Sequence, residues 1–351
     1  MVHSAPLLET LRMLAPGTEV RDGIDRILQG RRGALIVVGD DPGVLSICSG
    51  GFLLDAEFTP QRLSELAKMD GAIILNSDCT RVARANVQLM PDPTIRTTET
   101  GTRHRTAERV ARQIDAPVIS VSEDMAVVTI YRGEVRHTLM PISRILDRAN
   151  PALQTLQRYK SRFDTVMSQL SAHEIEDLTS VRDVALAVMR SEMVRRIAVE
   201  IDGYVIELGA DGRLILLQLE EMMAGVVADR FGVLRDYVPL DRMAEANTGI
   251  EQLSNDDVLN VRAVAETLFF DDSVDLDDGV SARGYRMLGR LPRLSDDLIN
   301  EVVEHFGTLH EIIRASMEEL MAVPSVSQVD AQNIKDGLSR LAEVSMMDRF
   351  A

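Results

Sequence analysis

The stretch from Ala152 to Asp202 contains neither glycine nor proline. Its apolar residues recur every three or four positions, the spacing of one buried helix face; the first of them are Leu153, Leu156, Tyr159, Phe163, Val166, Met167 and Leu170. A chain with so long a helical pattern has to build part of its fold on long helices. The letters SAHE have the form of a capping box, so Ser171 is predicted to separate two antiparallel helices.

Residues 1 to about 145 show a different pattern, in which short apolar runs rich in Val and Ile alternate with helical segments. The helix TPQRLSELAKM is predicted to start at Thr59 as N-cap, with Pro60 at its first position. The runs that predict strands are ALIVV (34–38), GAIIL (71–75), PVISVS (117–122) and MAVVTIY (125–131). Residues 1–145 are therefore predicted to form an α/β domain, a mixed sheet flanked by helices.

The rest of the chain reads as helical. Residues 146–283 are predicted to be a mainly helical spine or linker domain, with one small hairpin at 204–219 that turns at Asp211-Gly212. Residues 284–351 show four or five short helical patterns broken at RLPRLS, HFGT and VPSVSQ. This last segment is predicted to be an all-α module.

The acidic run FFDDSVDLDDG, residues 269–279, has the ligand spacing that opens a calcium-binding EF-hand loop, at Asp271, Ser273 and Asp275. The sixth position of such a loop should be glycine and the twelfth glutamate, but here they are Leu276 and Ala282. A solvated linker is the interpretation that fits these letters better.

Composition limits the kind of protein this is. The formal net charge of -17 argues against nonspecific coating of nucleic acid or of an anionic membrane, so any anion site has to be local. No run approaches the roughly 20 apolar residues of a membrane span, and the N-terminal letters do not resemble a secretory signal. Cys48 and Cys79 form no CxxC pair, which favours a reducing cytoplasm.

The letters TRHRT, residues 102–106, place three cationic side chains just ahead of the helical pattern AERVARQI. A helix N-terminus offers unpaired backbone N–H groups and the positive end of the helix dipole, and arginine can hold phosphate oxygens bidentately. Pairing with surface carboxylates is the alternative. Cations at this end of a helix are unfavourable unless an anion joins them, which favours a phosphate site.

Asp70 lies in KMDGAIIL, where a helix gives way to a strand. The small residues Gly71 and Ala72 after it leave room for a ligand beside the carboxylate, which could hold a metal for phosphoryl chemistry. Asp-Gly is also a common turn dipeptide, so this fragment alone leaves both interpretations open.

Three segments taken together, MDGAIIL (69–75), RANVQLMPDP (84–93) and TGTRHRTAERVA (100–111), resemble the diadenylate cyclase domain in order and separation. The whole chain is similar to the DNA-integrity scanning (DisA) branch of that family, in which this domain is followed by a helical spine and a helix-hairpin-helix domain. The resemblance implies that two ATP molecules are condensed into cyclic di-AMP with release of two pyrophosphates.

The resemblance also implies roles for single residues. Asp70 would bind Mg²⁺ or Mn²⁺ and help to activate the ribose 3′-hydroxyl, while Leu89 would pack near the adenine and Ser122 would contact a phosphate. Gly71 and Ala72 would line the nucleotide pocket. The residues that would hold the ATP phosphates are Thr102, Arg103, His104, Arg105 and Thr106.

In this reaction each ATP is both nucleophile and electrophile, so two half-sites have to face one another. Activity is therefore expected only from a symmetric homo-oligomer, in which Asp70 of one subunit opposes the phosphate site of another. The family forms octamers, and an octamer is expected here. No membrane association is expected.

The C-terminal module departs from its relatives. A helix-hairpin-helix loop usually has two glycines that let backbone N–H groups reach a DNA phosphate, but Ser325 and Ser327 occupy those positions in VPSVSQ. Residues 286–351 also hold seven Lys or Arg against eleven Asp or Glu, the opposite of a basic DNA-binding surface. Binding of branched DNA is accordingly doubtful. The alternatives to an active cyclase are a catalytically weak adenine-nucleotide sensor and a DNA-structure-binding checkpoint protein.

Overall fold

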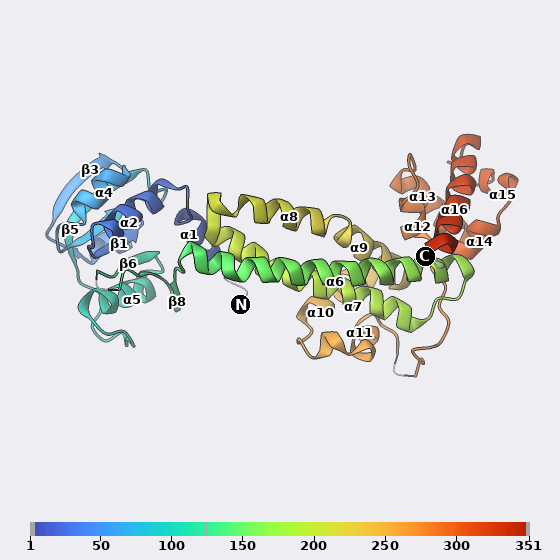
Figure 1. Ribbon diagram of the computed structural model, residues 1–351, viewed down its shortest axis with the longest axis horizontal. Helices are drawn as coiled ribbons and strands as arrows, with labels where there is room; N and C mark the ends of the chain where they lie inside the picture. Colours follow the sequence, from blue (N-terminus) through green and yellow to red (C-terminus); the bar gives the residue numbers. More distant parts are fainter. Residues whose placement is uncertain (1–3, 124, 272, 349–351) are drawn as a thin grey trace. The chain divides into compact units, whose positions relative to one another are not determined.

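The computed structural model describes residues 4–123, 125–271 and 273–348. Contacts group the chain into two compact units (Figure 1). The first comprises the chain through Pro151 together with Glu200–Gln218, and the second comprises Ala152–Val199 and the chain from Leu219 onward. The division into domains at 145 and 283 stays a prediction from the sequence.

The first unit contains one mixed sheet. Its strand order is β2-β5-β4-β1-β6-β7-β8, and β3 also pairs with β5. Strands β1 and β4 run parallel, whereas β5 and β6 are antiparallel to them. The described strands are β1 (Ala34–Val38), β2 (Cys48–Ser49), β3 (Phe52–Glu57), β4 (Ala72–Leu75), β5 (Arg81–Leu89), β6 (Val118–Val121), β7 (Val128–Arg132) and β8 (Val135–Thr138).

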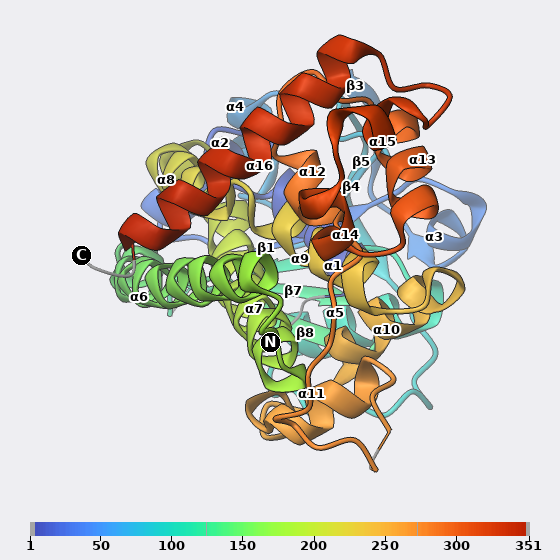
Figure 2. The ribbon, with the colours of Figure 1, turned by 90° about the vertical axis from the view of Figure 1, so that its right-hand side faces the viewer.

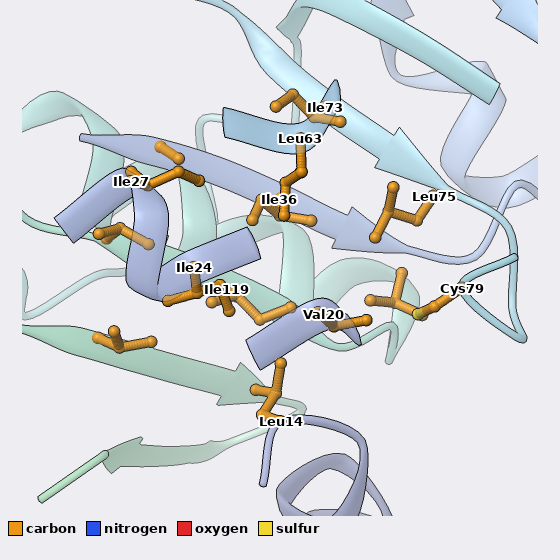
Figure 3. Close-up of a cluster of buried hydrophobic side chains, with 14 of the residues drawn as sticks. Leu14, Val20, Ile24, Ile27, Ile36, Leu63, Ile73, Leu75, Cys79 and Ile119 are labelled. Carbon is orange, nitrogen blue, oxygen red and sulfur yellow. The ribbon is translucent and has the colours of Figure 1, made fainter. Parts of the chain in front are cut away.

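Helices cover both faces of this sheet (Figure 1). They are α1 (Ala5–Met13), α2 (Glu19–Gln29), α3 (Pro42–Ser46), α4 (Pro60–Leu66) and α5 (Thr102–Ile114). Ile36 of β1 joins the core that α1, α2 and α4 cover, drawn in Figure 3, whereas Val37 joins the core under α3 and α5. This alternation follows the period of two in a strand and confirms the predicted α/β class.

Local signals in this unit are confirmed. The run ALIVV forms β1 with every residue buried. The Thr59 hydroxyl accepts a hydrogen bond from the Arg62 N–H at the start of α4, and Pro60 is the first helical residue. Both depend on residues close together in the chain, which is why the sequence alone could predict them.

The predicted break at Ser171 is wrong. Helix α6 (Ile142–Glu176) runs through it, and the buried Ser171 hydroxyl donates to the Met167 carbonyl at 2.8 Å. The capping box lies nine residues further on, where the Ser180 N–H donates to the Asp183 carboxylate at 2.9 Å and the Asp183 N–H donates to the Ser180 hydroxyl at 3.3 Å. Helix α7 (Val181–Leu208) begins there. Two sites share the S-x-x-acid pattern, and only one is at the start of a helix.

The predicted hairpin at 204–219 is also wrong. Helix α7 continues to Leu208, a 3-10 turn η1 (Gly209–Gly212) follows, and α8 (Arg213–Met223) continues the chain. Asp211-Gly212 does mark a turn, but it joins two helices. Gly209 has φ +51°, a Cβ there would lie 2.4 Å from the Pro16 carbonyl oxygen, and the Ala210 N–H donates to that oxygen at 2.9 Å. A distant contact therefore decides the conformation.

The remaining described elements are helical, as predicted for the linker and the C-terminal module. Figure 2 shows the last five helices, α12 to α16, gathered together. The elements are α9 (Val226–Tyr237), η2 (Leu240–Arg242), α10 (Met243–Gln252), η3 (Asp257–Leu259), α11 (Val261–Thr267), α12 (Tyr285–Gly289), α13 (Asp296–Phe306), α14 (Leu309–Arg314), α15 (Met317–Met321) and α16 (Gln328–Asp348).

The acidic run at 269–279 is mostly exposed, but it is anchored to the start of α7. Arg182 donates to Asp277 at 2.8 Å through its side chain, and its backbone N–H donates to the Leu276 carbonyl at 2.8 Å. Within the described parts of the chain, no group of three His, Cys, Asp or Glu side chains is arranged to hold a metal. Leu276 and Asp277 of this run therefore lie against the start of α7.

A buried ionic network joins α6, α9 and α12 within the second unit. The Arg286 guanidinium donates to Glu174 and, at 3.1 Å, to the Ser171 hydroxyl. Asp236 accepts hydrogen bonds from the N–H groups of Gly284 and Arg286. Burial and the charge of Glu174 raise the pKa of Asp236 to about 7, so a proton can balance two carboxylates against one arginine.

Replacing Arg286 by Met should lower the free energy of unfolding by about 3–5 kcal/mol, because Glu174 would stay buried without its cation. Urea denaturation followed by circular dichroism measures this. Lys68→Met is the control, since Lys68 pairs with Glu65 on the surface at 2.7 Å, where ion pairs contribute little. Equal denaturation midpoints for the two variants would show that the network does not stabilise the unit.

Candidate nucleotide-binding site

The sheet brings several predicted site residues to one end. The parallel register pairs Ile36 with Ile73, so continuing it towards the strand starts sets Gly33 level with Asp70. Strand β5 ends there at Leu89, and Ser122 follows the end of β6, because both strands run antiparallel to their neighbours β4 and β1. Segments spread over about a quarter of the chain thus converge at one sheet end.

Arg103 lies at the same end of the sheet, because its guanidinium packs against Gly33. A Cβ added to Gly33 would be 2.0 Å from Arg103 Nη1 and 2.6 Å from Cζ. Any larger residue at position 33 would displace the guanidinium. Gly33 was not among the residues predicted from the sequence, since RRGALIVV carries no motif that points to it.

Gly71 fits against the neighbouring strand. A Cβ there would lie 2.3 Å from the Asn86 carbonyl carbon and 2.6 Å from the Val87 nitrogen. The Gly71 N–H donates to Asn86 Oδ1 at 3.2 Å, and Asn86 itself has φ +53° at an irregularity in the β4–β5 pairing. Glycine is therefore needed for the close approach that holds the Asp70 turn in place. Asp70 is exposed, while Ala72 is buried in the sheet core.

Helix α5 starts at the sheet end with its N-terminal amides available. Gly101, with φ +84°, takes the N-cap position and provides no side-chain cap, and the first bond of the helix runs from the Arg105 N–H to the Gly101 carbonyl at 3.1 Å. Thr102 is exposed, as is the Arg105 side chain. The Thr106 hydroxyl donates to the Thr102 carbonyl at 2.9 Å. Amides, dipole and guanidiniums thus gather at one helix end.

His104 is held by a tyrosine that the sequence analysis missed. Its Nδ1 lies 3.0 Å from the hydroxyl of the buried Tyr131 on β7. Burial and the neighbouring Arg136 and Arg103 lower the pKa of His104, although Glu99 opposes them. The ring is therefore neutral near pH 7, and the contact with Tyr131 leaves Nε2 as the nitrogen that can face a nucleotide. A tyrosine inside an apolar strand gives no sequence signal of this role.

The loop of residues 90–101 is fastened along α5. Arg109 donates to the Ile95 carbonyl at 2.9 Å, and Arg112 donates to the Arg96 carbonyl at 2.6 Å. Glu108 accepts from the Thr98 N–H at 3.1 Å. These bonds hold the segment that leads to Gly101, so the start of α5 is fixed by side chains from the helix itself.

Comparison with known proteins identifies a nucleotide-binding domain in this part of the chain. The family model described as DisA bacterial checkpoint controller nucleotide-binding matches residues 21–135, and the DisA bacterial checkpoint controller linker region matches residues 139–276. The DNA integrity scanning protein DisA of Kineococcus radiotolerans is 51% identical over 98% of this chain and 97% of its own length. The chain belongs to the DisA family.

Other members of the DisA family agree. The DNA integrity scanning protein DisA of Streptomyces coelicolor is 50% identical over 97% of this chain and 93% of its own. Among solved structures, DacA from Staphylococcus aureus is 24% identical over 38% of this chain and 88% of its own, with a TM-score of 0.31. The predicted resemblance to the DisA family is confirmed, and residues 21–135 are its nucleotide-binding domain.

The described helices include none that is long and apolar enough to cross a membrane.

The serines at the C-terminal hairpin lie between α15 and α16. Ser325 is in the turn, and the Val326 N–H donates to the Val323 carbonyl at 3.0 Å. The Ser327 N–H donates to the Asp330 carboxylate at 3.1 Å, and the Asp330 N–H donates back to the Ser327 hydroxyl at 3.2 Å. The amides of Val326 and Ser327 are therefore already bonded, and a carboxylate lies beside that of Ser327. The helix-hairpin-helix identity of this module stays a prediction.

Replacing Gly33 by Ala should weaken nucleotide binding by about 10- to 100-fold, the loss expected for one displaced charge-assisted contact. The fold should persist, because Gly33 has an ordinary backbone conformation and the Arg103 side chain can move aside. Isothermal titration calorimetry with 3′-deoxy-ATP, which lacks the 3′-hydroxyl, measures the affinity. Gly289→Ala is the control, since a Cβ there meets nothing within 4 Å. Unchanged affinity in the Gly33 variant would mean that the position of Arg103 on Gly33 does not matter for the nucleotide.

Proposed function

We propose that this member of the DisA family is a diadenylate cyclase that condenses two ATP molecules into cyclic di-AMP and releases two pyrophosphates. The observation that carries the proposal is the Arg103 guanidinium lying on Gly33, a residue that the β1–β4 register, extended three residues beyond its printed pairs, would set level with Asp70. A carboxylate and an arginine next to a helix N-terminus form a site where a phosphoryl group can be attacked and its charge balanced.

The proposed reaction is attack by a ribose 3′-oxygen on an α-phosphorus, with pyrophosphate as leaving group. Negative charge then develops on the nonbridging and leaving oxygens. Positioning of the two nucleotides supplies most of the remaining rate enhancement. Arg103, Arg105 and the first amides of α5 would bind these oxygens. His104, oriented by Tyr131, would contact these oxygens through Nε2.

Asp70 is proposed to bind the divalent metal, Mg²⁺ or Mn²⁺, and to orient the attacking hydroxyl. A single carboxylate fits Mg²⁺ in nucleotide enzymes, which commonly use one or two protein carboxylates and complete the shell with substrate phosphates and water. When bound, the metal would supply charge stabilisation and a more acidic hydroxyl.

The other predicted contacts complete the proposed pocket. Gly71 would let the nucleotide approach the backbone, with Ala72 behind it. Leu89 is 8% exposed, so the exposed edge of its side chain or its backbone would contact the adenine. Ser122 would contact a phosphate, and Thr102 and Thr106 would add hydroxyl groups at the start of α5.

Cyclisation needs two half-sites, so the proposal includes a homo-oligomer, with an octamer expected from the family. Exposed apolar residues near the site favour self-association. On the edge strand β3, Phe52 is 57% exposed and Leu53 is 77% exposed, and Met90, just after the end of β5, is 59% exposed. Because β3 pairs with β5, this apolar edge adjoins the strand that ends in the site.

Regulation by branched DNA is not part of the proposal, because the Ser327 N–H already donates a hydrogen bond to the Asp330 carboxylate. A catalytically weak nucleotide sensor is the alternative that the site itself permits. The two differ in whether product forms.

Asp70→Asn should lower cyclic di-AMP formation by at least about 100-fold, because the charge that binds the metal is lost while size is kept. Product is measured by liquid chromatography with mass detection after incubation with ATP and Mg²⁺ or Mn²⁺. Asp22→Asn is the control, an exposed aspartate on α2. Near-normal turnover in the Asp70 variant would refute its role. Unchanged ATP with the native oligomer and either metal would instead favour the sensor.

Leu53→Lys should dissociate the oligomer and reduce turnover per chain in parallel, raising the dissociation constant by about tenfold or more. Light scattering after size exclusion measures the assembly, and titration with 3′-deoxy-ATP tests whether the separated chains still bind nucleotide. Leu214→Lys is the control, because Leu214 on α8 is 74% exposed. An intact, active oligomer in the Leu53 variant would exclude β3 from the interface.

A further inference from the structure

Helices α7, α9 and α10 of the second unit surround a pocket of about 500 Å³. This volume lies within the range of small-molecule sites. Its walls are apolar and come from three separate helical segments; they include Val226, Val227, Phe231, Leu234, Leu240 and Met243. All lining residues lie between 191 and 251, outside the nucleotide-binding domain at 21–135.

The apolar wall reaches the surface. Val227 is 68% exposed, Phe231 57% and Leu240 52%, although each is a large hydrophobic residue. Apolar side chains gathered at the opening of a pocket are typical of a binding site, because their cost in water is recovered when a ligand covers them.

Under this wall, three arginines converge on one carboxylate. Glu192 is fully buried and accepts hydrogen bonds of 2.7 Å each from Arg195, Arg196 and Arg230. Burial alone would raise the pKa of Glu192, but the bonds from Arg195 and Arg196 hold it below its usual range. The carboxylate is therefore ionised and offsets one of the three positive charges.

Two of the three arginines, Arg195 and Arg230, line the pocket, whereas Arg196 also donates to the Leu253 carbonyl at 2.6 Å. Glu251 at the same opening offsets one further charge, so the whole cluster, Arg196 included, keeps a net charge of about one. Arg230 is only 6% exposed, its Nη2 reaches the Asn247 carbonyl at 3.4 Å, and its Nε has no hydrogen-bond partner among the described residues. A buried guanidinium with incomplete bonding is stabilised by an added anion.

We propose that this pocket binds a small amphipathic anion, a molecule with an apolar body and one carboxylate, phosphate or sulfonate group directed at Arg195 and Arg230. The apolar wall and the single surplus charge disfavour a highly charged nucleotide such as ATP. The site is therefore independent of the proposed cyclase chemistry.

Two dyes that share one aromatic body test the proposal. The probe is 8-anilinonaphthalene-1-sulfonate, and N-phenyl-1-naphthylamine is the same body without the sulfonate. Fluorescence titration of the full-length oligomer should show one saturable site per chain, at least about tenfold tighter for the sulfonate. Absence of saturable binding of the sulfonate would overturn the proposal.

Variants locate the dye and separate its two contacts. Ala244→Trp fills the pocket from an exposed position, and Phe231→Ala removes part of the wall. Each variant should therefore lower the affinity for both dyes by about tenfold. Arg195→Gln should weaken only the sulfonate, with Arg195→Lys restoring part of the affinity. Leu259→Ala is the matched control for Phe231→Ala, because Leu259 is 58% exposed and lies outside the pocket.

Three results would overturn the proposal. Unchanged binding in Ala244→Trp would place the dye elsewhere, and an unchanged preference for the sulfonate in Arg195→Gln would remove the anion contact. Dissociation of the oligomer by Ala244→Trp, seen by light scattering, would assign the pocket to contact between copies. Thermal unfolding of each variant separates these results from loss of the fold.

Discussion

The parallel pairing of β1 with β4 is the constraint on which the nucleotide-binding site depends. Because these strands run in the same direction, the residues that precede them, Gly33 and Asp70, start from the same end of the sheet. Because β5 and β6 run antiparallel to β4 and β1, the last residues of β5 and β6 lie at this same end of the sheet. One register thus assembles a site from four strands, and a shift by one residue would turn each side chain to the opposite face.

Glycine determines how closely the site can pack. Gly33 leaves space for the Arg103 guanidinium, and Gly71 leaves space for the backbone of Asn86. The first glycine positions a cation, whereas the second positions a turn that carries an anion, Asp70. A side chain at either position would separate groups whose chemistry requires them to be close.

The two buried arginine networks of the second unit have opposite balances. Around Arg286, one cation meets two carboxylates, and a proton or backbone N–H groups complete the bonding, which is typical of a structural joint. Around Glu192, three cations share one carboxylate beside an open apolar pocket. The first network has no positive surplus. The second has a positive surplus that a ligand can satisfy.

The sequence by itself determined whatever depends on near neighbours in the chain. The run ALIVV and the cap at Thr59 were predictable, because periodicity and capping act over a few residues. The family was recognised from three short segments for the same reason. The helix expected after Thr106 begins earlier, at Thr102, so Arg103 to Arg105 lie within its first turn and not ahead of it. The helix break assigned to Ser171 and the hairpin at 204–219 were wrong, because packing against residues far away in the chain chose among locally equivalent patterns. Only the tertiary structure decided that Gly33 and Tyr131 matter, since each acts through a partner that no sequence spacing reveals. It also added Arg230, 38 residues away, to the helical-spacing partners of Glu192.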